Sequence, residues 1–175
     1  MIIILLKIRV CIIGVFHKYN SQIQIIMNSG SRANKTGGKL ENTIESTLTN
    51  YTKIDRTQFL TTYMKADAPI YSRQVHIGDS IYNTKLFCDF ILYHPKKHPH
   101  CLVIESKWQQ TAGSVDEKYP YLVENINKLP YKTLIVIDGG GYKKGAEEWL
   151  RKQQNDKLQV MNIVEFLKWT NNDNI

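Results

Sequence analysis

The apolar residues change their spacing along the chain, and the first regular pattern is helical. Four of them recur every three or four residues: Leu40, Ile44, Leu48 and Tyr51. This spacing places them on one face of an α-helix, so a first helix is predicted from about residue 40. Residues 52–69 carry no clear periodicity and predict no element.

Strand-like patterns dominate the middle of the chain, over residues 70–77, 81–93 and 101–107. These segments are rich in β-branched and aromatic residues, which favour strands. Turn-forming residues separate them, at 78–80 between the first two and at 94–99 between the second and third. The pattern therefore predicts two successive β-hairpins.

Helix and strand patterns alternate in the second half. Ser114 and Glu117 have the spacing of a capping box, which indicates a helix near residue 115, and Pro120 either kinks that helix or marks its start. The remaining predicted elements are a strand over residues 133–137, a helix over 145–153, an edge strand over 158–161 and a closing helix over 163–169. The order of elements predicts an α/β domain with a mixed central sheet.

Three charged residues interrupt the apolar strands. Fifteen residues lie between Asp89 and Glu105, and Lys107 follows two positions later. Side chains alternate along a strand, so Glu105 and Lys107 share one face, and strand pairing brings Asp89 to them. Such a pair is often only a solvated ion pair, but unpartnered charge is costly in so apolar a segment. Oxygen ligands of this kind suit Mg²⁺ or Mn²⁺, which favours a metal-dependent phosphodiesterase site.

The pattern of Asp, fifteen residues and Glu-x-Lys resembles the PD-(D/E)XK nuclease superfamily, with Cys88 where the family name has Pro. The resemblance covers about residues 37–150, and residues 109–121 are similar to type II restriction endonucleases of this superfamily. It implies a restriction-endonuclease-like αβββαβ core, with a mixed central sheet flanked by helices, in a nuclease domain over residues 37–175.

Site residues follow from the resemblance. It implies that Asp89, Glu105 and the main-chain carbonyl of Ser106 hold the metal ion, Mg²⁺ or alternatively Mn²⁺. It also implies that Lys107 positions or deprotonates the attacking water.

Two further residues are candidates for the same site. The first helix of the family often supplies one more acid, and Glu41 is the candidate, ahead of Glu45. Gln109 shares the face of Lys107 if the strand continues, and its amide can then bond a phosphate, a base edge or the nucleophilic water.

The formal net charge of +7 fits a polyanionic partner. Double-stranded DNA is the partner that the resemblance implies, and a homodimer is left open. Candidate phosphate contacts are Lys35, Lys39, Lys118, Lys143 and Lys144. The alternative is a disordered tail without a partner for Lys35 and Lys39, and a surface charge on a helix for Lys118. The glycines at 139–141 match no nucleotide-binding motif, so a tight strand-to-helix connection is favoured there.

Residues 1–26 differ in composition from the rest of the chain. Residues 1–26 contain three basic residues and no acid, and their apolar run is interrupted by charge and too short to span a bilayer. They also lack the basic leader of a secretory signal. Residues 1–36 are therefore predicted to be a flexible or mis-annotated extension, with Met27 as the true start. The three cysteines have no CxxC spacing and are predicted to be small buried residues of a cytoplasmic protein with no membrane segment.

A chain that begins at Met27 is expected to fold and to cut DNA as well as the full chain does, because the predicted domain needs no residue before it. Solubility, thermal unfolding and cleavage rate would be compared for the two chains. Loss of solubility or of activity in the shorter chain would show that residues 1–26 belong to the domain.

The patterns together predict an Mg²⁺-dependent endonuclease that hydrolyses DNA phosphodiester bonds, most like a type II restriction endonuclease. One alternative is a structure-selective or repair nuclease, because the chain from Met27 onward is short for a separate base-reading domain. The other is a non-catalytic nucleic-acid-binding module, which the presence of Asp89, Glu105 and Lys107 disfavours.

Overall fold

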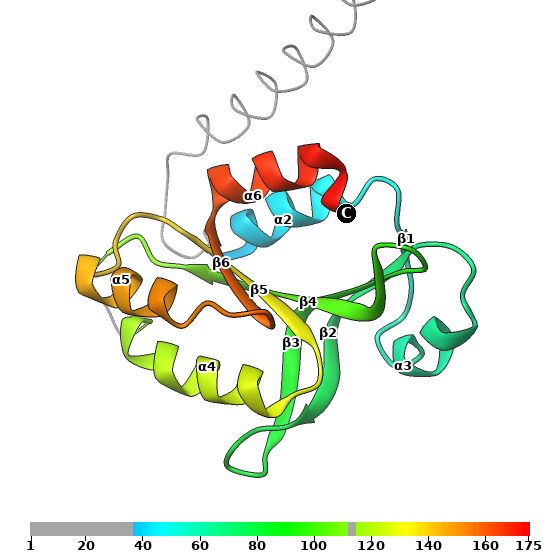
Figure 1. Ribbon diagram of the computed structural model, residues 1–175, viewed down its shortest axis with the longest axis horizontal. Helices are drawn as coiled ribbons and strands as arrows, with labels where there is room; N and C mark the ends of the chain where they lie inside the picture. The colour runs from blue at the N-terminus through cyan, green and yellow to red at the C-terminus, as the bar shows by residue number, and fades with distance from the viewer. Residues whose placement is uncertain (1–36, 112–114) are drawn as a thin grey trace, which may run out of the picture. The chain divides into compact units, whose positions relative to one another are not determined.

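A computed structural model of the protein describes residues 37–111 and 115–175 (Figure 1). The predictions made for residues 1–36, Cys11 and Lys35 among them, lie outside the described residues. The same is true of Ser114 in the predicted capping box.

A six-stranded mixed sheet forms the centre of the domain. Its strands are β1 (Thr52–Lys53), β2 (Ile70–Asp79), β3 (Lys85–His94), β4 (His98–Trp108), β5 (Lys132–Asp138) and β6 (Leu158–Asn162), and they lie in the sheet in chain order. Antiparallel pairing joins β2, β3 and β4, whereas β1 pairs parallel with β2, and β4, β5 and β6 pair in parallel. The predicted mixed sheet and the αβββαβ order of its core are confirmed.

Helices cover both faces of this sheet. The α-helices are α2 (Gly37–Thr47), α3 (Phe59–Thr62), α4 (Tyr119–Lys128), α5 (Lys144–Lys152) and α6 (Ile163–Trp169), and the shorter turns are η1 (Tyr63–Lys65), η2 (Asp116–Lys118) and η3 (Thr170–Asn174). Figure 1 shows α2 and α6 together on one side of the sheet and α4 and α5 on the other. The flanking helices that the fold prediction includes are therefore present.

Apolar burial explains why these elements form. Leu40 and Ile44 of α2 are buried, as is Leu48 directly after it, which confirms the first predicted helix. Strand β5 has five consecutive buried residues, Thr133 to Ile137, as expected of a parallel strand that helices cover on both faces. Each fully buried Leu or Ile contributes about 1.5–3 kcal/mol relative to an exposed one.

Several boundaries differ from the predicted ones. Strand β3 begins at Lys85 and not at residue 81, because residues 80–84 form the hairpin turn, in which Asn83 has φ of +57°. Helix α4 begins at Tyr119, so Pro120 lies in its first turn and marks its start without a kink. The unpatterned segment 52–69 contains β1, α3 and η1.

The two cysteines within the described residues, Cys88 and Cys101, are buried and free, as predicted. Burial raises the pKa of Cys101 to about 12 and raises the pKa of Cys88 as well. Both thiols therefore stay protonated and behave as small apolar side chains. Within residues 37–111 and 115–175, no helix combines the length and the apolar character needed to cross a membrane.

Candidate active site

Strand register brings the two predicted acids together. Phe90 of β3 pairs with Ile104 of β4, so the next positions along the two strands are Asp89 and Glu105. Directly opposed residues of an antiparallel pair point to the same face. The ammonium of Lys107 lies 2.8 Å from Glu105 Oε2 and 3.6 Å from Asp89 Oδ2. The structure thus places the two carboxylates and the ammonium in one cluster.

Further hydrogen bonds hold the Asp89 carboxylate. Its Oδ2 accepts bonds from the backbone amide of Ser106 at 2.8 Å and from the Ser106 hydroxyl at 2.9 Å. Its Oδ1 accepts a bond of 3.2 Å from the side-chain amide of Gln74. Gln74 has φ of +52°, a left-handed conformation that is uncommon in a strand. The sequence carries no pattern that singles out Gln74.

The electrostatics of the cluster depend on burial. Glu105 is only 9% exposed, and this burial raises its pKa, although the charge of Lys107 opposes the shift. Burial alone would lower the pKa of Lys107, but the two carboxylates outweigh it, so the pKa of Lys107 is raised. Lys107 therefore keeps its proton at neutral pH. With both acids ionised, the three groups carry one net negative charge (−2 + 1 = −1), which favours a cation.

The side chains of this cluster offer few ligands to a metal ion. Among the described residues, no group of three or more His, Cys, Asp and Glu side chains is arranged to hold a metal. The side-chain ligands available at this cluster are thus the carboxylates of Asp89 and Glu105. Mg²⁺ is usually bound through one or two carboxylates and keeps several of its waters, so a sparse oxygen set of this kind is compatible with it.

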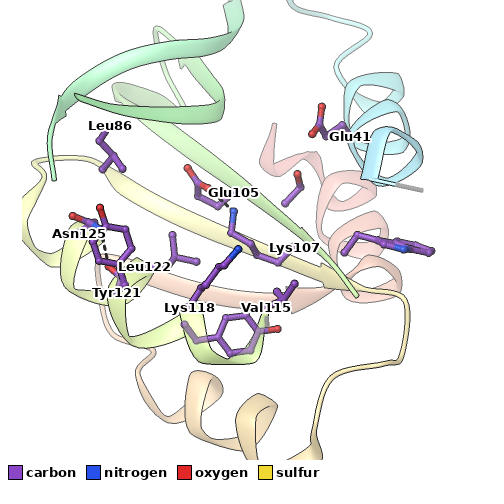
Figure 2. Close-up of a pocket in the computed structure, with 12 residues that line it drawn as sticks. Glu41, Leu86, Glu105, Lys107, Val115, Lys118, Tyr121, Leu122 and Asn125 are labelled. Atoms are coloured by element: carbon purple, nitrogen blue, oxygen red, sulfur yellow. Dashed lines mark hydrogen bonds and ion pairs between the residues drawn. The ribbon is translucent and has the colours of Figure 1, made fainter. Parts of the chain in front are cut away.

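A pocket of about 420 Å³ adjoins the cluster (Figure 2). It is lined by Glu41, Leu86, Glu105, Ser106, Lys107, Trp108, Val115, Lys118, Tyr119, Tyr121, Leu122 and Asn125. Figure 2 shows Lys118 extending from the helical side of the pocket toward Lys107. Lys118 is thus the one predicted phosphate contact, among those in the described residues, that lines this pocket.

Glu41 lies at the pocket wall but does not join Asp89 and Glu105 in a cluster of acids. Its carboxylate forms an ion pair with Arg73, whose guanidinium also lies 2.7 Å from Glu45 and 4.9 Å from the centre of the Phe90 ring. Arg73 therefore neutralises the acid that the sequence suggested as an extra site residue. No sequence pattern indicates this partner, because Arg73 is distant from α2 in the chain.

Gln109 is not placed as predicted. Strand β4 ends at Trp108, so the alternation that would align Gln109 with Lys107 stops one residue too early. The Gln109 side chain is 4% exposed, and its amide donates a hydrogen bond of 3.2 Å to the carbonyl of Gly141. Gln109 therefore supports the glycine turn after β5 and does not line the pocket.

The glycine turn packs tightly against this segment. Gly139 has φ of +102°, and a Cβ atom added there would lie 2.5 Å from the carbonyl oxygen of Gln109. Gly141 donates a backbone hydrogen bond of 2.7 Å to that oxygen. Only glycine permits both the positive φ and the close approach, which supports the predicted tight connection.

Gly139→Ala is expected to destabilise the protein by roughly 1–3 kcal/mol, because the new methyl group overlaps backbone atoms and the positive φ strains any larger residue. Gly145→Ala is the matched control, since a Cβ there has no neighbour within 4 Å. Urea unfolding would compare the two variants with the unmodified chain. Equal stability of Gly139→Ala and the unmodified chain would contradict the packing described here.

The other predicted phosphate contacts lie away from the pocket. Lys143 and Lys144 are exposed around the start of α5, and the Lys144 ammonium lies 3.8 Å from Glu148. Lys39 is half-buried in α2. None of these three lysines lines the pocket beside Lys107.

Comparison with known protein families agrees with this arrangement. A family model described as a PD-(D/E)XK nuclease superfamily domain matches residues 32–174, a range that contains all six strands and the cluster of Asp89, Glu105 and Lys107. No curated protein and no solved structure matches the chain. Nucleases of this superfamily usually use divalent metal ions. By the extent of the family match, the chain belongs to the PD-(D/E)XK nuclease superfamily.

Proposed function

We propose that this protein is an Mg²⁺-dependent endonuclease that hydrolyses phosphodiester bonds in double-stranded DNA, most like a type II restriction endonuclease. One observation carries the proposal: the Lys107 ammonium lies between two carboxylates, 2.8 Å from Glu105 and 3.6 Å from Asp89, beside a pocket. Glu105 is buried and Asp89 and Lys107 are partly buried, and a trio of this composition suits hydrolysis of a charged ester.

The carboxylates of Asp89 and Glu105, with the main-chain carbonyl of Ser106, would hold the metal ion. A divalent ion bound there supplies positive charge to the scissile phosphate and lowers the pKa of a water molecule. Hard oxygen ligands favour Mg²⁺, with Mn²⁺ as an alternative. The hydrogen bonds from Ser106 and Gln74 keep the Asp89 carboxylate oriented for this role.

Lys107 supplies a fixed positive charge beside the reacting phosphate. Because the carboxylates raise its pKa, Lys107 stays protonated and acts as a hydrogen-bond donor. Of the two roles that the resemblance implies, this favours positioning the attacking water and stabilising developing negative charge over removing a proton. The ion pairs fix the ammonium before the substrate arrives.

The lysines would contact DNA phosphates at two different distances from the scissile phosphate. Lys118 lines the pocket and extends toward Lys107, so its ammonium would bind a phosphate next to the scissile one. Lys39, Lys143 and Lys144 would bind more distant phosphates. Such contacts add affinity without sequence preference, and this affinity falls as the salt concentration rises.

The test is incubation of the purified protein with supercoiled plasmid in Mg²⁺, in Mn²⁺ and in EDTA, followed by mapping of the cut ends. Discrete fragments in Mg²⁺ and none in EDTA are the expected result. Branched and flapped duplexes would be included, because preferential cutting of those substrates would identify a structure-selective nuclease instead. Failure to cut any substrate with either ion would contradict the proposal.

A further inference from the structure

The hairpin formed by β2 and β3 has one buried face and one exposed face. Val75, Ile77 and Cys88 are buried in an apolar cluster that also contains Leu129. The residues at neighbouring strand positions, Gln74, His76 and Phe87, are exposed. Packing of the core therefore does not account for the side chains on the exposed face.

Aromatic rings are unusually accessible on this hairpin. His76 pairs directly with Phe87 across the strands, and their ring centres lie 5.4 Å apart, although Phe87 is 46% exposed. Tyr82 in the turn is 71% exposed, and one face of its ring stacks on Tyr121 of α4 at 5.1 Å. Removing such apolar surface from water is favourable, so these rings suit contact with a partner.

Contacts to α4 hold the hairpin turn in place. The backbone amide of Ile81 donates a hydrogen bond of 2.8 Å to the Asn125 side chain, and the Lys128 ammonium donates one of 2.7 Å to the carbonyl of Ser80. Gly78 approaches Leu129 so closely that an added Cβ would lie 2.7 Å from its side chain. The exposed rings are therefore presented on a preorganised element, which reduces the entropy lost on binding.

The exposed face leads directly to the proposed site. Gln74 on this face donates to Asp89, and Phe87 precedes Asp89 by two residues on the same strand, a separation of about 7 Å. That distance equals about two base-pair rises of duplex DNA. Figure 1 shows the β2–β3 turn extending past the end of α4. A two-stranded ribbon of this kind fits the major groove of DNA.

Resting on the nuclease function proposed above, we infer that the exposed face of the β2–β3 hairpin is the base-reading element of this protein. The hairpin enters a groove of the duplex, and His76 and Phe87 contact base edges within about two base pairs of the scissile phosphate. Imidazole nitrogens can donate hydrogen bonds to base edges or accept hydrogen bonds from them. An apolar ring can contact the thymine methyl group. An imidazole and an apolar ring can distinguish bases, whereas the lysines contact phosphates.

On this placement, base recognition and catalysis share strand β3, which carries both Phe87 and Asp89. The sequence preference is then set by residues of the same hairpin that carries Asp89.

The experiment is selection of bound duplexes from a randomised DNA library in Ca²⁺, which reports sequence preference without cleavage. His76→Ala and Phe87→Ala are each expected to lose preference at one or two adjacent base pairs by about tenfold, while binding to arbitrary duplex changes little. Trp149→Ala is the matched control, because Trp149 is an aromatic residue on α5 with 38% exposure, far from the hairpin in sequence. The control should enrich the same sequences as the unmodified protein.

Two results would overturn the inference: no enriched sequence with the unmodified protein, or the same enriched sequence with unchanged preference in both hairpin variants. Thermal unfolding of each variant would confirm that the exposed substitutions leave the fold intact. The two proposals fail separately. A protein whose enriched sequence depends on His76 and Phe87, but which cuts nothing in Mg²⁺, supports the hairpin inference and contradicts the nuclease function.

Discussion

Asp89→Asn and Glu105→Gln are each expected to lower DNA cleavage by about a thousandfold or more, because each removes one of two carboxylates that would hold the metal ion. Both substitutions preserve side-chain shape, and the amide oxygen introduced by Asp89→Asn can still accept the hydrogen bonds from Ser106. Initial rates of plasmid cleavage in Mg²⁺ measure the effect. Circular dichroism and thermal unfolding establish that the variants are folded.

Glu148→Gln is the matched control for this pair of variants. It makes the same chemical change on α5, where Glu148 is exposed and lies 3.8 Å from the Lys144 ammonium. Its cleavage rate should equal that of the unmodified protein, since surface ion pairs contribute little. Unmodified rates of cleavage by Asp89→Asn or Glu105→Gln would refute the assignment of the site.

Lys107→Ala is expected to lower the rate of DNA cleavage strongly and to retain DNA binding in Ca²⁺. Removal of the ammonium takes away a fixed charge that acts on the transition state, with an expected loss of about a hundredfold to a thousandfold in rate. Ca²⁺ also occupies oxygen sites and tolerates looser geometry, so it allows binding to be measured without cleavage. Fluorescence anisotropy in Ca²⁺ and single-turnover cleavage in Mg²⁺ would separate the two effects.

Lys144→Ala provides the contrast, because Lys144 is exposed and lies outside the pocket. If Lys144 contacts a distant phosphate, its removal weakens binding to all sequences. The slope of log affinity against log salt concentration should also become shallower by about one. Bound DNA should then be cut at the normal rate. If Lys107→Ala instead weakens binding while bound DNA is cut normally, Lys107 is only another phosphate contact.

Long, strongly patterned elements were predictable from the sequence. The closing helix was expected over residues 163–169, where α6 lies, because Ile163, Phe166 and Leu167 repeat at helical spacing and are buried. Strand β1 was missed because it consists of Thr52 and Lys53 only, both exposed, with no periodicity to detect. Its place in the sheet depends on parallel pairing with β2, a contact that is distant along the chain.

The central part of the site was predictable for a different reason. Alternation along β4 and the length of the β3–β4 hairpin together require that Asp89, Glu105 and Lys107 meet. The same argument fails for Gln109, because strand β4 ends at Trp108 and alternation no longer applies. The Gln109 side chain donates a hydrogen bond to the carbonyl of Gly141 instead. No local sequence pattern indicates the positive φ of Gln74 or its hydrogen bond to Asp89.

Strand β4 lies inside the sheet, paired with β3 on one side and β5 on the other, with Glu105 opposite Ile135 and Lys107 opposite Ile137. Backbone amides in such a strand exchange with solvent only in openings that approach global unfolding. Enzymes that carry their reactive groups on loops can lose activity through local melting well below the unfolding temperature. Two of the three proposed catalytic residues, Glu105 and Lys107, are attached to this strand, which should open last. Heat inactivation and global unfolding should therefore occur together.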